Sequence, residues 1–229
     1  KGCYLLSADG QQADYSWMFG HQAMITQVYS DDFTKGLFAG SGNGFNNYRL
    51  RPDRFQTFLA KDLGNAPYGM SMRGIAKVGR NKIFFASELY GLWELDLNTN
   101  AVSRPGDRSP QLAPLNELKY PRNMLAQGDS ILWISCVGAV LKYDLIKGTL
   151  DFFKTKQGQD NSGAAEVWGI SFGKDGNLWV VPRDARLLKM SPATGNFSVY
   201  LDKEGNAPLK AQPSFILCSR DGTIWVGTT

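Results

Sequence analysis

The chain has 229 residues, of which 43% are hydrophobic, so it can form one domain with a substantial core or at most two. Its 25 Lys and Arg against 21 Asp and Glu give a net charge of +4, and the basic residues are scattered along the sequence. Such a weak and dispersed charge excludes a nucleic-acid-binding surface, and the lack of an apolar run of about 18 residues argues against membrane insertion of this chain.

An aromatic residue in an apolar segment recurs along the chain. The recurring residues are Phe38, Phe84, Trp133, Trp179 and Trp225, separated by 46, 49, 46 and 46 residues. A period in the forties, with short apolar segments and turns rich in Gly and Asp, is typical of the blades of a β-propeller. From Trp225 through the C-terminus and on from the N-terminus to Phe38 is 42 residues, so a fifth step closes a ring.

Each repeat is predicted to contain four short strands. The first strands are largely apolar on both faces, as expected of inner strands between neighbouring blades, and cover 22–30, 73–78, 122–127, 167–173 and 214–219. The second strands carry the recurring aromatic residue. The third strands alternate apolar and polar residues, and cover 47–52, 92–97, 140–145 and 187–192, with 2–10 supplying the fifth. Outer strands follow at 55–60, 102–105, 150–156 and 197–201, with 12–19 from the N-terminus.

The predicted fold class is therefore all-β, a β-propeller of five four-stranded blades that forms a single domain over 1–229. The strands from the two chain ends share one blade, which ties the ring shut and removes free sheet edges. The expected blades cover about 1–20 plus 209–229, then 21–66, 67–118, 119–160 and 161–208.

Two segments, DGTIWVGTT at 221–229 and KDGNLWVVPRDARLLKMSPATGNFSVY at 174–200, resemble the two-component regulator propeller repeat. That repeat pairs a second strand containing an Asp-Gly turn, a Trp and a Gly-Thr end with a third strand and a TGxF turn. The match is good at Asp221, Gly222, Trp225, Gly227 and Thr228. Other blades depart from it, with Pro182-Arg183, Ser135-Cys136 and Ala86-Ser87 in place of Gly-Thr.

The resemblance implies the extracytoplasmic sensory part of a membrane histidine kinase or hybrid regulator, in the periplasm or outside the cell. In this family such propellers often respond to polysaccharide fragments. Its members usually carry two seven-bladed rings, whereas this chain has five repeats and no transmembrane or kinase segment. The alternatives are an independent five-bladed ring or a stretch of a larger, seven-bladed propeller.

The binding surface is predicted on the face that carries the longer connections. Connections between second and third strands, and between blades, are expected to be long and to emerge on this face, at 40–48, 62–72, 105–121, 156–166 and 202–213. Residues that open inner strands or close second strands should surround the axis there. The candidate ligand-binding residues are His21, Arg73, Glu88, Arg122, Asn123, Glu166, Trp168 and Arg183. Arginine forks, amides and an indole suit a sugar, a carboxylate or a peptide, while the alternative is that they cap blade junctions.

Catalytic and metal chemistry have little support in the sequence. His21 is the only histidine, which excludes a multi-histidine metal cage. Apart from Asp31 and Asp32 at the turn end of the first, the inner strands contain no Asp or Glu, so a two-carboxylate hydrolysis has no obvious place. We therefore expect no catalytic residue, metal or cofactor, and a non-catalytic sensor domain with a small-molecule, oligosaccharide or protein partner. The alternatives are a propeller enzyme, either a hydrolase or a lyase, and a protein–protein interaction scaffold.

Overall fold

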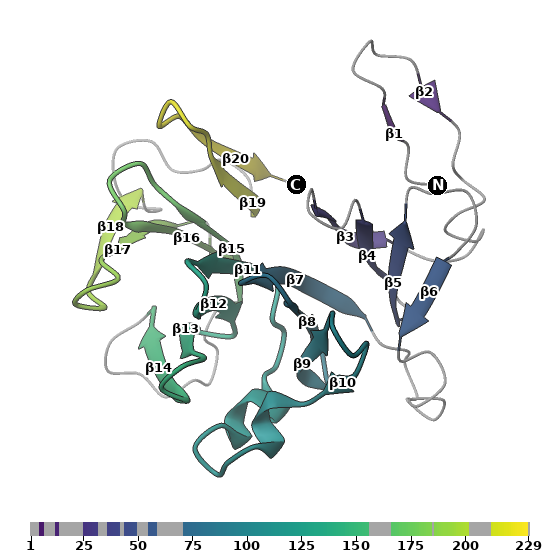
Figure 1. The fold of residues 1–229 in the computed structure, drawn as a ribbon. Coiled ribbons are helices and arrows are strands. Elements are labelled where there is room, and N and C mark those ends of the chain that lie inside the picture. The colour runs from purple at the N-terminus through teal and green to yellow at the C-terminus, as the bar shows by residue number, and fades with distance from the viewer. Residues whose placement is uncertain are drawn as a thin grey trace.

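In the computed structural model, successive sheets follow one another around a common centre, with inner strands near the middle and outer strands at the periphery (Figure 1). The structure describes residues 71–155, 166–184, 186–201 and 212–228, and before them the backbone of six strands between residues 5 and 58. Within these residues no helix has the length and apolar character needed to cross a bilayer. His21 lies outside the described residues.

Four blades are complete, and each is an antiparallel sheet of four strands in chain order, which confirms the all-β class and the four-stranded blade. The first contains β3 (Ile25–Asp31), β4 (Gly36–Ser41), β5 (Gly44–Arg49) and β6 (Phe55–Phe58). The second contains β7 (Met72–Val78), β8 (Lys82–Ser87), β9 (Gly91–Asp96) and β10 (Val102–Ser103). The third contains β11 (Met124–Gln127), β12 (Ile131–Cys136), β13 (Ala139–Asp144) and β14 (Thr149–Lys154). The fourth contains β15 (Val167–Phe172), β16 (Leu178–Pro182), β17 (Leu187–Met190) and β18 (Phe197–Leu201).

The core lies between consecutive blades. Phe84 and Trp133 are fully buried and Trp179 is 6% exposed, and each packs toward the next blade in the chain. Phe84 meets Tyr143 of the third blade edge to face, with ring centroids 6.2 Å apart. Because a buried aromatic ring stabilises a sheet-to-sheet contact by about 1.5–3 kcal/mol, Phe84, Trp133 and Trp179 act first as packing residues in these three blades.

Glycines in the inner strands allow neighbouring blades to approach closely. A Cβ atom on Gly74 of β7 would lie 2.9 Å from Cγ of Met124 on β11. On Gly169 of β15 it would lie 3.0 Å from Cγ2 of Ile216. A larger residue at either position would force these neighbouring side chains to shift, so glycine suits the close approach of adjoining inner strands.

The connections between second and third strands are short, contrary to prediction. β4 and β5 are joined through residues 42–43 alone, because Ser41 already pairs with Gly44. The predicted third strand 47–52 therefore begins earlier, at Gly44, and Asn46 and Asn47, which lie within the predicted connection 40–48, take part in the sheet. Segment 105–121 contains two short helices, η2 (Pro105–Asp107) and η3 (Ala113–Glu117).

The two chain ends form separate two-stranded sheets, and the predicted shared blade is not seen among the described strands. β1 (Leu5–Leu6) pairs with β2 (Gln12–Ala13), and β19 (Pro213–Cys218) pairs with β20 (Ile224–Thr228). The two sheets lie apart, and β1 and β2 are only two residues long (Figure 1). The count of five blades and the domain bounds stay predictions.

Candidate ligand-binding site

Inner strands begin with a β-bulge that turns one side chain out of the regular alternation. The pairing register shifts within Met72–Gly74 of β7 and within Val167–Gly169 of β15, which leaves Arg73 and Trp168 as the extra residues. In the third blade Arg122 has the corresponding position. The backbone N–H of Arg122 donates to the Ser135 carbonyl, and the Ser135 N–H donates to the Asn123 carbonyl. Equivalent bulges in three blades therefore place Arg73, Arg122 and Trp168 alike.

Two glutamates adjoin these bulges and link three blades through ion pairs. Arg122 lies between them, with Nη1 3.0 Å from Oε1 of Glu88 and Nη2 2.8 Å from Oε2 of Glu166. At one end, Nη2 of Arg73 lies 3.2 Å from Oε2 of Glu88. At the other end, Nη1 of Arg183 lies 3.9 Å from Oε1 of Glu166. We call these five residues the Arg–Glu row.

Aromatic rings flank the Arg–Glu row. The Trp168 indole N–H donates to Oε2 of Glu166 at 3.0 Å. The Trp168 ring centroid lies 5.2 Å from Cζ of Arg122 and 5.5 Å from Cζ of Arg183. Tyr120 places its ring 5.5 Å from Cζ of Arg122. Trp168 is therefore already engaged by two guanidinium groups, which fix its orientation.

The row carries one more positive than negative charge, and its members differ in exposure. The side chains of Glu88, Arg122 and Glu166 are 14–18% exposed, so the centre of the row is largely shielded from solvent. The Arg183 side chain is 49% exposed, and its distance to Glu166 is at the limit of an ion pair. Arg183 is therefore the cation with donors left to offer to an external anion.

Six of the eight predicted site residues come together in or beside this row: Arg73, Glu88, Arg122, Glu166, Trp168 and Arg183. Asn123 follows Arg122, and its backbone N–H donates to Oγ of Ser135 at 2.8 Å. Its side-chain carbonyl oxygen is buried and has no hydrogen-bond partner within the described residues. His21, the eighth, lies outside them.

Tyr120 is the site residue that sequence reasoning missed. It has a positive φ of 51°, which is rare for an aromatic residue, and its N–H donates to the Glu88 carbonyl at 2.9 Å. No sequence signal marked Tyr120, because its place beside the bulge at Arg122 depends on the pairing register of the strands.

The arrangement suits anion binding better than acid–base catalysis. Glu88 and Glu166 lie on either side of the Arg122 guanidinium, and each is paired with a second arginine. Carboxylate oxygens that already accept from two arginines have few lone pairs left to act on a substrate. In the part of the chain that the structure describes, no group of three His, Cys, Asp or Glu residues could hold a metal ion.

The fold is similar to that of several solved propellers. The extracellular domain of BT4673 from B. thetaiotaomicron, described both as a one-component and as a hybrid two-component system, matches with a TM-score of 0.69 and 17% identity. The match covers 92% of this chain and 26% of that one. The extracellular domain of the hybrid two-component system BT3049 from the same organism matches with a TM-score of 0.67 and 17% identity, over 94% of this chain and 28% of that one. This chain thus spans about a quarter of the length of both.

An enzyme is also similar in structure. A catalytically inactive virginiamycin B lyase from Staphylococcus aureus, bound to quinupristin, matches with a TM-score of 0.69 and 13% identity. This match covers 98% of this chain and 76% of that one. No family model matches the sequence, and no curated protein does so either. These likenesses confirm the propeller fold, and sensor domains of the type suggested by the repeat are among the neighbours.

Proposed function

We propose that the chain is a non-catalytic recognition domain of a sensor, and that it binds a carboxylate-bearing ligand over the Arg–Glu row. The observation that carries this proposal is the unequal use of the three arginines. The Arg122 guanidinium pairs with two carboxylates, whereas the Arg183 side chain is 49% exposed and lies 3.9 Å from its carboxylate partner, Glu166. A ligand carboxylate would complete the fork of Arg183 with charge-assisted hydrogen bonds.

The rest of the row would act on the ligand indirectly. Glu166 accepts from Arg122 and from the indole N–H of Trp168, so it fixes the ring on which the Arg183 guanidinium rests. A guanidinium held against an aromatic plane loses less side-chain freedom on binding, which favours affinity. Glu166 and Trp168 are therefore positioning residues in this proposal.

The sensor role is supported by the likeness to extracellular domains of the two-component systems BT4673 and BT3049. We infer a location outside the cytoplasm, in the periplasm or beyond, on the same ground. Acidic sugars and peptide termini share the carboxylate that Arg183 would recognise. The proposed ligand class is therefore a small carboxylate carried on a sugar or a peptide.

The test is a calorimetric titration with a glucuronate-containing disaccharide and with its methyl ester, which lacks the charge. We expect the acid to bind and the ester to bind at least about tenfold more weakly, because a charged hydrogen bond contributes about 1.5–3 kcal/mol. Arg183→Ala should weaken binding of the acid by a similar factor. Arg80→Ala is the matched control, since Arg80 is exposed in the turn at the opposite end of β7.

Two outcomes would contradict the proposal. Equal affinity of Arg183→Ala and the wild type for the acid would remove Arg183 from the site. Chemical conversion of the disaccharide during the titration, abolished by Glu166→Gln, would indicate an enzyme of the hydrolase or lyase type instead.

A further inference from the structure

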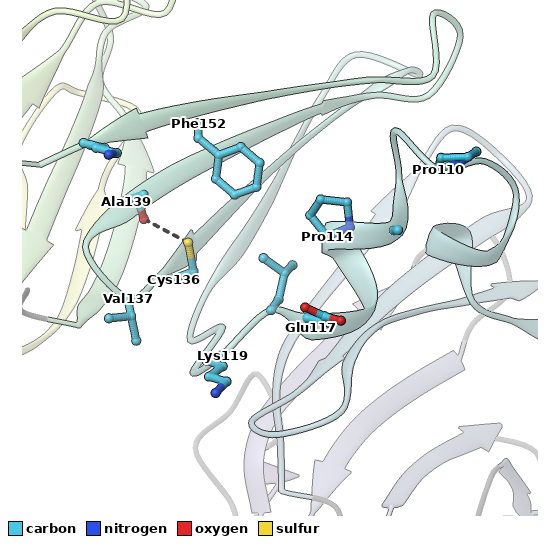
Figure 2. Close-up of a pocket in the computed structure, with 11 residues that line it drawn as sticks. Pro110, Pro114, Glu117, Lys119, Cys136, Val137, Ala139 and Phe152 are labelled. Carbon is cyan, nitrogen blue, oxygen red and sulfur yellow. Dashed lines mark hydrogen bonds between the residues drawn. The ribbon is translucent and has the colours of Figure 1, made fainter. Parts of the chain in front are cut away.

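A groove of about 740 Å³ lies between η3 and the third blade, apart from the Arg–Glu row (Figure 2). Its volume is within the range of about 300–1,000 Å³ that holds small-molecule ligands. Pro114 of η3 and Phe152 of β14 stand on its two sides, and Val137 and Ala139 form part of the strand side. We call this feature the η3 groove.

The helical side of the η3 groove is held firmly in place. Leu112, Leu115 and Leu118 are buried in the core between the second and third blades. The Arg104 guanidinium donates to the carbonyl of Asn116 at 2.9 Å, which anchors the end of η3. The groove is therefore preformed, and a ligand would not have to order its wall.

The strand side of the η3 groove offers apolar surface without reactive chemistry. Phe152 is 47% exposed, whereas Trp133 and Tyr143 of the same blade are buried. The Cys136 thiol donates to the Ala139 carbonyl at 3.4 Å, and burial raises the pKa of Cys136 to about 12. Cys136 is therefore a neutral thiol that contributes surface and not a nucleophile.

The charge around the η3 groove is positive. Lys119 and Lys154 line it and are exposed, and neither has an ion pair among the residues that the structure describes. Glu117 is the one acidic residue among the described residues that line the groove, so cations exceed anions there. An apolar slot with unpaired ammonium groups at its rim is complementary to an amphipathic anion.

We propose that the η3 groove is a second ligand site, which takes a small amphipathic anion. The apolar body of the ligand lies between Phe152 and Pro114, and its acidic group lies near Lys119 and Lys154. This inference does not depend on the Arg–Glu row, because no residue of that row lines the groove.

The test uses two dyes that share an aromatic body but differ in charge. 8-Anilinonaphthalene-1-sulfonate is the anion, and N-phenyl-1-naphthylamine is its uncharged counterpart. Titration of the full chain, followed by dye fluorescence, should show binding of the sulfonate at least about tenfold tighter than that of the amine. Phe152→Ala and the double variant Lys119→Ala/Lys154→Ala should each weaken sulfonate binding by about tenfold or more.

Matched controls separate the groove from other exposed apolar surface. Tyr200 is 62% exposed on β18 and Trp225 is 62% exposed on β20, so Tyr200→Ala and Trp225→Ala remove aromatic surface elsewhere. Both should bind the sulfonate as the wild type does. The proposal is overturned if the two dyes bind equally, if Phe152→Ala leaves sulfonate binding unchanged, or if a control variant loses as much. Phe152, Lys119 and Lys154 are exposed, so circular dichroism should show unchanged folding of their variants.

Discussion

Arg122 connects three blades because its guanidinium binds carboxylates that come from both neighbours. Nε and Nη2 both donate to Oε2 of Glu166, at 3.2 and 2.8 Å, and Nη1 pairs with Glu88. Its side chain is 14% exposed, so these bonds form in partly desolvated surroundings. Removing a partly buried cation leaves two carboxylates facing each other without a counter-ion, which is costly.

Arg122→Ala should therefore lower the free energy of unfolding by about 2–4 kcal/mol. Arg122→Lys keeps the charge but loses the planar fork, so it should give a smaller loss. Urea unfolding followed by tryptophan fluorescence measures both, with Arg80→Ala as an exposed control expected to stay within about 0.5 kcal/mol of wild type. An Arg122→Ala variant as stable as the control would mean that the row does not hold the blades.

For the individual site residues, the sequence predicted which of them lie close together but not which ion pairs they form. Six candidates were expected near the axis because they open inner strands or close second strands, and the structure brings them together. The bulges that orient Arg73 and Trp168 depend on pairing register, which composition and periodicity do not reveal. The loose pairing of Arg183 depends on side-chain geometry, which appears only in the folded chain.

The segment between the second and third blades, 105–121, differs from its prediction. It was predicted to be a long connection, yet it contains η2 and η3 and contributes three leucines to the core. The available signal was the spacing of Leu112, Leu115 and Leu118, three residues apart, which is typical of one helical face. Regular strands were easier to predict, because the recurring aromatic residue marks the second strand of each repeat and a turn containing Gly or Asp precedes it.

Gly91 of β9 is in direct contact with η3. Its φ is +74°, and a Cβ atom there would clash with the Leu115 carbonyl oxygen. Gly91→Ala should therefore destabilise the protein by about 2–4 kcal/mol, from backbone strain together with displacement of η3. Gly148→Ala is a matched control, since Gly148 has a φ of +64° but open space around it. Equal losses in chemical denaturation would show that η3 does not pack on Gly91.

Aspartates in the turns make stability depend on acid pH. Hydrogen bonds from Lys189 and Asn177 lower the pKa of Asp175 from 3.8 to about 2. Hydrogen bonds donated by backbone N–H groups also lower the pKa values of Asp96 and Asp144. Since the folded pKa is lowered, the ionised aspartates stabilise the fold above pH 3.8, and this contribution is lost as pH falls through the folded pKa.

Thermal unfolding measured between pH 5 and pH 2 should therefore show falling stability, with most of the Asp175 contribution lost below about pH 4. Asp175→Asn should flatten this dependence, because the amide does not titrate. Parallel curves for Asp175→Asn and wild type would contradict the role of the Lys189 pair.

At the scale of the whole molecule, the last sheet differs from the blades before it. One face of β19 and β20 packs on the fourth blade through Ile216, Ile224 and Val226. The other face carries Phe215 and Trp225, which are 51% and 62% exposed. Trp225 is the repeat equivalent of the buried Trp133 and Trp179, so its exposure is the consequence of having no following blade packed on it among the described residues.

Trp225→Ala should accordingly change stability by no more than about 0.5 kcal/mol, whereas Trp179→Ala should cost about 3–5 kcal/mol. Denaturant midpoints of the two variants, with acrylamide quenching of the Trp225 emission, measure the difference. A loss at Trp225 as large as that at Trp179 would instead support the predicted shared blade, because a ring closed through that blade would pack the next blade on this indole.

The proposed function requires that a carboxylate ligand contact the Arg183 end of the Arg–Glu row. Nuclear magnetic resonance of arginine side chains labelled with nitrogen-15, assigned with Arg183→Ala and Arg80→Ala, measures this contact at the guanidinium itself. On addition of the glucuronate-containing disaccharide, the Nε signal of Arg183 should shift in a saturable way while that of Arg80 stays fixed. An Arg183 signal that does not move at saturating ligand would contradict carboxylate binding at the Arg–Glu row.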